Sequence, residues 1–198
     1  DWEKGEPVGT TFGGGFSNPG VDVLTDCGRE AYVTGNGGGN GGNDDIDGGI
    51  TVLTSPIINL STYSDPYIHF DRWFFNAGAN QNDSLTIAIN NGAISKIIDF
   101  ADVNDPNLGQ WTTKVMRVTD FVSVTNNTTL TIQAMDVNGG DIVEAGFDNF
   151  FVTEGLVNVG YVEEENSLVI YPNPFSSEIN IAFSNKELDK IKIETLDL

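Results

Sequence analysis

Short runs of strand-forming residues, each followed by a turn signal, recur through the first 155 residues of the chain. No segment in that region shows a convincing helical repeat of apolar residues. About eight to ten strands with this spacing and no helices predict an all-β fold, a jelly-roll β-sandwich. The predicted strands are Glu30–Val33, Ile50–Leu53, Tyr67–Phe75, Ser84–Asn90, Ile94–Asp99, Thr112–Val118, Thr129–Met135 and Ile142–Val152.

The strand Tyr67–Phe75 differs from the others because it is apolar on both faces. Ile68, Phe70 and Phe74 alternate onto one face, whereas Tyr67, His69 and Trp73 share the other. A central strand covered on both sides would have this pattern. Aromatic rings beside polar groups are also typical of a sugar-binding platform. The second face, with Tyr67, His69 and Trp73, is therefore a candidate ligand site.

The segment between residues 34 and 55 is too rich in glycine to form a stable helix. It contains Asn43-Asp44-Asp45-Ile46-Asp47-Gly48, in which alternate acidic side chains could direct oxygens toward one cation. A dinucleotide site is excluded, because the glycines lack a following helix and the acidic residues would repel a pyrophosphate. An EF-hand is excluded because position twelve is Thr54 rather than glutamate. The segment is either a calcium-binding loop or a solvated turn.

A second acidic pattern lies near the end of the predicted sandwich. Alternation places Glu144 and Asp148 on the same side of their strand, among Phe147, Phe150 and Phe151. A carboxylate in such apolar surroundings is costly to bury unless it is paired or bound to a metal. This pattern favours calcium more than the glycine-rich segment does alone.

The balance of charge excludes several classes of partner. The chain has 29 acidic and nine basic residues and a net charge of -20. Nucleic acids and anionic membrane surfaces are therefore disfavoured as partners, whereas a calcium-rich extracellular setting suits the composition. No segment has the roughly 18 consecutive apolar residues of a membrane helix, so no direct membrane insertion is expected. The sequence begins at Asp1, and we expect it to be part of a longer exported protein.

Nothing in the sequence favours catalysis. His69 is the only histidine, and no Gly-x-Ser-x-Gly motif accompanies it. Cys27 is the only cysteine, so there is no internal disulfide. We expect it to be either a buried small apolar residue or a reactive thiol.

The composition changes after Glu154. Residues 156–166 carry Glu163-Glu164-Glu165 and little apolar patterning, which predicts a linker. Three short strand-like runs follow in residues 167–198. They are Leu168–Phe175, Glu178–Phe183 and Lys190–Thr195.

The tail resembles the start of the C-terminal sorting domain of type IX secretion cargo. The resemblance rests on Tyr171-Pro172-Asn173-Pro174-Phe175 and the following Glu178-Ile179-Asn180-Ile181. That domain is an Ig-like β-sandwich, of which residues 167–198 would form only the N-terminal part. The resemblance implies export by the type IX machinery to the surface of a Gram-negative bacterium.

Residues 1–155 resemble the MAM-like jelly rolls of secreted bacterial proteins. These include cleaved-adhesin modules and modules that follow secreted zinc carboxypeptidases. The matching stretches are Trp2-Glu3-x-Gly5, Tyr32-Val33-Thr34-Gly35-Asn36, Asp45-x-Asp47, Leu53-Thr54-Ser55-Pro56 and Ile142-Val143-Glu144-Ala145-x-x-Asp148-Asn149. The resemblance implies a structural calcium ion held by Glu3 and Asp148. Asp45 and Asp47 are further candidate ligands because of their spacing.

Two functions remain open on this basis. The first is a noncatalytic, calcium-stabilised accessory module of a secreted cell-surface protein, with a metallopeptidase as the parent chain. The alternative is a carbohydrate-binding or adhesive module that uses Tyr67, His69 and Trp73.

Overall fold

The structure is a computed structural model of the chain and describes residues 1–78, 82–137, 140–155, 168–171 and 180–183. It divides the chain into two compact units, Asp1–Leu156 and Val157–Leu198. The predicted linker, residues 156–166, and the predicted strand Lys190–Thr195 lie outside the described residues.

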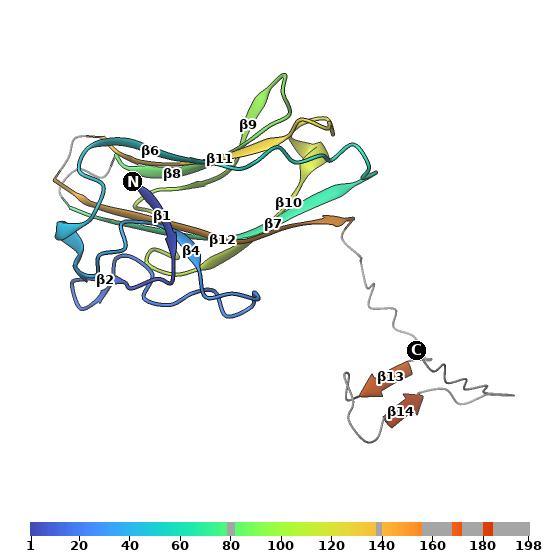
Figure 1. The fold of residues 1–198 in the computed structure, drawn as a ribbon, viewed down its shortest axis with the longest axis horizontal. Coiled ribbons are helices and arrows are strands. Elements are labelled where there is room, and N and C mark those ends of the chain that lie inside the picture. Colours follow the sequence, from blue (N-terminus) through green and yellow to red (C-terminus); the bar gives the residue numbers. More distant parts are fainter. Residues whose placement is uncertain (79–81, 138–139, 156–167, 172–179, 184–198) are drawn as a thin grey trace, which may run out of the picture. The chain divides into compact units, whose positions relative to one another are not determined.

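The first unit is a sandwich of two antiparallel sheets (Figure 1). Every strand predicted for this unit is present, and each boundary agrees within two residues, which confirms the all-β jelly-roll fold. The five-stranded sheet has the order β1 (Trp2–Gly5), β4 (Ala31–Thr34), β12 (Ile142–Glu154), β7 (Pro66–Ala77) and β10 (Thr112–Arg117). The four-stranded sheet has the order β6 (Gly49–Thr54), β11 (Thr129–Asp136), β8 (Ser84–Asn90) and β9 (Ser95–Ala101).

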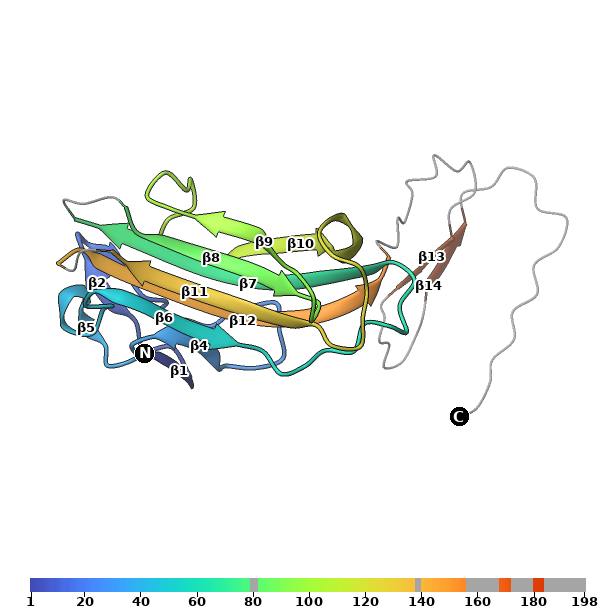
Figure 2. The same ribbon diagram turned by 90° about the horizontal axis from the view of Figure 1, so that it is seen from above.

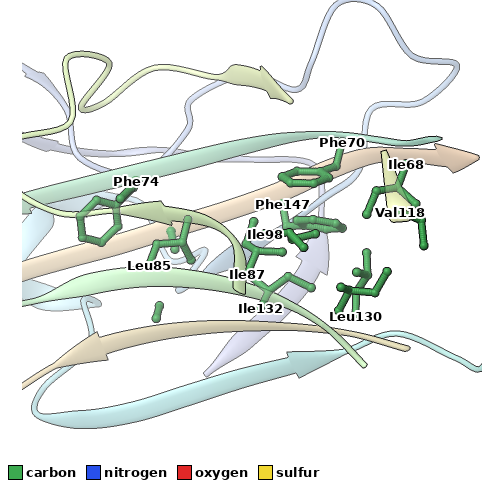
Figure 3. Packing of buried hydrophobic residues seen from close by; sticks show 14 of the residues in the cluster. Ile68, Phe70, Phe74, Leu85, Ile87, Ile98, Val118, Leu130, Ile132 and Phe147 are labelled. Atoms are coloured by element: carbon green, nitrogen blue, oxygen red, sulfur yellow. The ribbon is translucent and has the colours of Figure 1, made fainter. Parts of the chain in front are cut away.

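The core lies between the two sheets (Figure 3). Phe70 and Phe147 pack against each other from β7 and β12, with ring centroids 5.4 Å apart. Leu85, Ile87 and Ile132 face them from the four-stranded sheet and are almost fully buried. This arrangement follows the period-two alternation in the sequence, which places every second side chain of a strand in the core.

A buried cation also joins the two sheets. Arg72 lies on the core face of β7 and donates to Asp99 on β9 over 3.0 Å and to Asp105. Lys114 forms a further ion pair with Asp99 at 3.0 Å. These carboxylates offset the cost of burying the guanidinium group.

The chain between β1 and β4, residues 6–30, folds over the outer face of the five-stranded sheet, where Figure 1 shows it in blue. We call it the N-terminal segment. Its strands β2 (Thr10–Phe12) and β3 (Gly15–Phe16) form a small sheet with β5 (Gly39–Asn40), which follows β4 in the glycine-rich segment. The described part of the unit also contains the 3-10 helices Gly41–Asn43 and Val118–Asp120. Strands β2, β3 and β5 were not predicted, because they have two or three residues each and little apolar alternation.

In the second unit, β13 (Leu168–Tyr171) pairs with β14 (Asn180–Phe183) in antiparallel fashion. This pair is the part of the predicted Ig-like sandwich that falls within the described residues. No helix in the described part of the chain has the length and apolar character needed to cross a membrane.

Candidate functional site

One half of the outer face of the five-stranded sheet is closed by the N-terminal segment. Trp73 on β7 is only 6% exposed, and its indole Nε1 donates to the carbonyl of Ser17 over 2.8 Å. Trp111 packs edge-on against Trp73 and donates to the carbonyl of Val21 over 2.9 Å. The predicted platform of Tyr67, His69 and Trp73 therefore does not include Trp73, because the N-terminal segment covers its ring.

The other half of this face exposes a row of apolar and aromatic side chains. Cross-strand pairing places Val115 on β10, His69 on β7 and Phe151 on β12 side by side. The rings of His69 and Phe151 are stacked, with centroids 4.4 Å apart and an interplanar angle of 5°. Val115 is 42% exposed and Phe151 is 44% exposed. We call these three side chains the aromatic row.

Polar side chains flank the aromatic row on one side. The adjacent row across the strands consists of Arg117, Tyr67 and Thr153. The Oγ1 of Thr153 lies 2.9 Å from Nε2 of His69, and Nε of Arg117 donates to Asp65 over 2.7 Å. Tyr67 is half-buried, so its hydroxyl-bearing ring borders the row rather than standing clear of the sheet.

On the other side the flanking row is formed by Thr113, Asp71 and Asn149. The Nδ2 of Asn149 donates to Asp71 over 2.8 Å, and the hydroxyl of Thr113 donates to the same carboxylate. Asp71 is buried and holds both neighbours in place. Burial lowers the pKa of His69, so its imidazole is neutral at pH 7. The site thus combines a neutral aromatic row with hydrogen-bonding groups along both sides.

A β-bulge in β12 is responsible for the exposure of Phe151. The pairing with β7 shifts by one residue between Asp148 and Phe151, and Asn149 adopts a positive φ of 52°. Asparagine tolerates this left-handed conformation better than most residues. After the shift Phe150 packs near Phe147 with centroids 6.4 Å apart, and Phe151 turns outward onto His69. Sequence alternation alone does not show such a shift, so neither Phe151 nor Val115 was predicted as a site residue.

A group of three carboxylates lies next to this site. Oxygen atoms of Asp22, Asp26 and Asp148 come within 4.8 Å of one another. One buried oxygen of each residue has no hydrogen-bond partner among the described residues. Burial and the neighbouring Asp22 raise the pKa of Asp148 to about 7. We call these residues the acidic cluster. Asn149 lies between the acidic cluster and the aromatic row. Its Nδ2 donates to Asp71, beside the aromatic row, and lies 3.4 Å from Oγ1 of Thr25, the residue before Asp26.

Of the four predicted metal ligands, only Asp148 belongs to the acidic cluster. Asp45 interacts electrostatically with Asp47 and Asp136, and burial raises its pKa. Its charge also acts on Glu144, which precedes Asp148 by four residues, or about 13 Å along a strand. Glu3 is exposed on β1. The four residues therefore do not converge on one point, because the glycine-rich segment packs against a different part of β12.

The acidic cluster fits a hard cation such as calcium. Calcium binds carboxylate oxygens in irregular geometry, and the three unpartnered oxygens would be satisfied by it. Asp22 and Asp26 also line an open depression of about 320 Å³ beside Glu6 and Arg29. Sequence reasoning missed these two aspartates because their loop has no recognisable ligand spacing.

Cys27 directly follows Asp26 in the sequence and is a free, exposed cysteine. The expectation of a buried small apolar residue at this position is therefore wrong. The N-terminal segment that carries Cys27 crosses the outer surface of the sheet and does not enter the core.

No protein-family model matches the chain, and no curated protein sequence matches it. Among solved structures, SGBP-B from a complex xyloglucan utilization locus in Bacteroides uniformis is 14% identical, covering 78% of this chain and 45% of that one, with a TM-score of 0.42. A structure of carbohydrate-binding modules from the β-sandwich superfamily is 12% identical, covering 78% and 56%, with a TM-score of 0.43.

The C-terminal CBM6 of LamC from Zobellia galactanivorans is 17% identical, covering 75% of this chain and 100% of that one, with a TM-score of 0.30. The chain spans about half the length of the first two of these structures. At these TM-scores the similarities identify neither a family nor a ligand for the chain.

Proposed function

We propose that the sandwich unit is a noncatalytic glycan-binding module and that the aromatic row is its binding surface. The observation that supports this is the exposed ring of Phe151, held by stacking on His69 and flanked by polar side chains. The C–H groups on the face of a sugar ring are weakly positive and pack favourably on the negative face of an aromatic ring. The hydroxyl groups at the edge of the sugar would meet the two flanking polar rows.

The dimensions of the row favour a short glycan. Val115, His69 and Phe151 lie on three adjacent strands, so the row is about 10 Å long at the usual strand spacing. This length accommodates one or two sugar rings. The buried carboxylate of Asp71, held by Thr113 and Asn149, gives that side of the site a fixed hydrogen-bonding pattern. Fixed polar groups beside an apolar surface are the usual source of specificity in small ligand sites.

The test compares variants of Phe151 on a glycan array and by isothermal titration with each glycan that binds. Phe151→Ala should weaken binding at least about tenfold, the effect expected for a central aromatic contact. Phe151→Tyr should keep most of the affinity. Ile57→Ala is the matched control, because Ile57 is an exposed apolar residue outside the site. The proposal fails if no glycan binds or if Phe151→Ala binds as the wild type does.

We also propose that the unit has no catalytic activity. His69 is the only histidine of the chain, and its neighbours are a stacked phenyl ring and the hydroxyl of Thr153. Purified chain should show no glycosidase or peptidase turnover on model substrates. Activity that survives repurification and disappears in His69→Ala would contradict this prediction.

Calcium is proposed as a stabilising ion of the unit, held by Asp22, Asp26 and Asp148. The support is the convergence of three carboxylates that each have a buried oxygen without a partner. A bound cation would offset the repulsion among these carboxylates and hold the loop of residues 22–26 against β12.

For the whole protein, we propose a secreted cell-surface protein of a Gram-negative bacterium, exported through its tail by type IX secretion. The support is the Tyr171-Pro172-Asn173-Pro174-Phe175 sequence and its following strand. A metallopeptidase remains the proposed parent chain on the sequence resemblance alone. The glycan-binding module would then hold that enzyme close to its substrate.

A further inference from the structure

Among the described residues, the outer face of the four-stranded sheet carries no charged side chain. Figure 2 looks onto this sheet, with β6, β11, β8 and β9 side by side. Cross-strand register identifies the side chains that point away from the core. They are Ile50, Val52 and Thr54 on β6, Thr129, Thr131, Gln133 and Met135 on β11, Ser84, Thr86, Ala88 and Asn90 on β8, and Ser95, Ile97 and Phe100 on β9. We call this set the uncharged face.

The lack of charge is unexpected in this chain. Residues 1–155 contain 21 acidic and six basic residues, and the solvent side of an antiparallel sheet is ordinarily polar. Here Ile97 and Phe100 are 59% and 54% exposed, and Ile50 and Val52 are also exposed. These apolar side chains lie on the two edge strands, β6 and β9, so a ligand that crosses the sheet would contact both groups.

The distribution of side chains indicates what kind of ligand fits. One row across the sheet runs Val52, Gln133, Thr86 and Phe100. The adjacent row runs Thr54, Thr131, Ala88 and Ile97. Aliphatic and aromatic groups therefore lie mainly on the outer strands, and hydroxyl and amide groups lie mainly between them.

Charge excludes two of the possible occupants. A second copy would bring together two sandwiches that each carry a net charge of -15, and an acidic polymer would be repelled in the same way. An uncharged polymer with both C–H surfaces and hydroxyl groups matches the face without either penalty.

We infer that the uncharged face binds an extended, uncharged polysaccharide. The strands have six to eight residues, so the face is about 20 Å long and could contact several consecutive sugar units. The ligand class rests on the glycan-binding function proposed above. The choice of the uncharged face as a binding surface is independent of that proposal, because this face lies on the opposite sheet from the aromatic row.

The test measures the affinity of the full chain for three neutral polysaccharides, xyloglucan, mixed-linkage β-glucan and galactomannan, and for polygalacturonate as an acidic polymer. We expect binding of at least one neutral polymer and none of polygalacturonate. Phe100→Ala and Gln133→Ala should each weaken the neutral polymer about tenfold. Lys96→Gln is the matched control, because Lys96 lies on the same strand but its register places it off the face. Melting curves verify that the variants fold.

Each remaining outcome overturns the inference, and the pattern shows whether the proposed function fails with it. If Phe151→Ala abolishes polymer binding and the β9 and β11 variants do not, the aromatic row is the glycan site and the uncharged face is not. If only short glycans bind, the function stands and the inference fails. If no glycan of any length binds, both fail. If sedimentation shows a dimer that Val52→Asp dissociates, the face is an interface between copies of the chain.

Discussion

Phe151 depends for its exposure on one additional residue in β12. In strict alternation from Asp148, Phe150 would face His69 and Phe151 would face the core. The bulge at Asn149 exchanges the two, so Phe150 packs near Phe147 and Phe151 stacks on His69. Bulges commonly redirect a side chain in this way at functional sites. The sequence contains the residue that tolerates the bulge, but an asparagine between aromatic residues does not by itself reveal a register shift.

Glu144 is the least accessible acidic group in the region covered by the N-terminal segment. It is fully buried and accepts hydrogen bonds from the hydroxyls of Thr34 and Thr10, at 2.8 and 3.4 Å. Burial raises its pKa from 4.5 to about 9. The folded protein therefore holds a proton that the unfolded chain has lost between these two pH values. The contribution of protonated Glu144 to the stability of the fold is therefore complete below the pKa of the unfolded chain. It is lost as the pH rises toward the pKa of the folded protein.

Glu144→Gln should consequently gain stability relative to the wild type as the pH rises. Chemical denaturation at pH 5 and pH 8 should show the difference in unfolding free energy moving in favour of the variant by about 1 kcal/mol or more. Asp148 is unchanged in the variant, so its own titration cancels in this difference. Glu3→Gln serves as the control at an exposed position. Parallel pH profiles for wild type and Glu144→Gln would show that Glu144 is ionised in the folded protein.

At the scale of elements, the loop of residues 22–26 depends on what neutralises its carboxylates. It contributes Asp22 and Asp26, and β12 contributes Asp148. Without a cation, burial and the neighbouring Asp22 and Asp26 disfavour the ionised form of Asp148 and raise its pKa. With calcium bound, the folded state gains RT ln(1 + [L]/Kd), or about 2.7 kcal/mol at a hundredfold excess over Kd.

Chelation should therefore lower the melting temperature by several degrees. Asp148→Asn should remove most of the gain from calcium. In chelator the same variant should melt at or above the wild type, because one repelling charge is gone. Asp47→Asn is a direct comparison, since Asp47 was predicted from sequence as a ligand and lies outside the acidic cluster. A wild-type melting curve that is the same with calcium and with chelator would exclude the ion.

The elements themselves show where sequence reasoning succeeded. Strand-forming runs between turn signals predicted β8 at its observed bounds, Ser84–Asn90, and the long strands β7 and β12 within two residues. A strand that must bury one face records that requirement in its sequence. The N-terminal segment left no such record, because several of its contacts with the sheet use backbone carbonyl groups, such as those of Ser17 and Val21 that accept from the two indoles. The apolar character of both faces of Tyr67–Phe75 allowed a strand covered on both sides, which holds at Trp73. Any residue can supply those carbonyls, however, so the sequence did not show which segment covers the ring.

For the whole molecule, the tail gives a prediction that is independent of the sandwich. If the tail is a type IX sorting signal, the complete native tail fused to a foreign exported protein should carry that protein to the cell surface. Substituting Pro172 and Pro174 should reduce delivery, because each proline restricts the backbone around it. A matched fusion with substitutions at Lys190 and Lys192 controls for general damage. Equal surface delivery of a chain ending at Gly155 would contradict the assignment.

The hydrogen bonds of Trp73 and Trp111 also allow detachment of the N-terminal segment to be observed by tryptophan fluorescence. The chain has three tryptophans, and these two hold the N-terminal segment through their indole nitrogens. Detachment of the segment would expose Trp73 to water and shift its emission to longer wavelength while the four-stranded sheet, which has no tryptophan, contributed nothing. Trp2, on β1, can be replaced by phenylalanine to simplify the signal. Under conditions in which the sandwich stays folded, opening of the N-terminal segment can thus be followed with no label added to the protein.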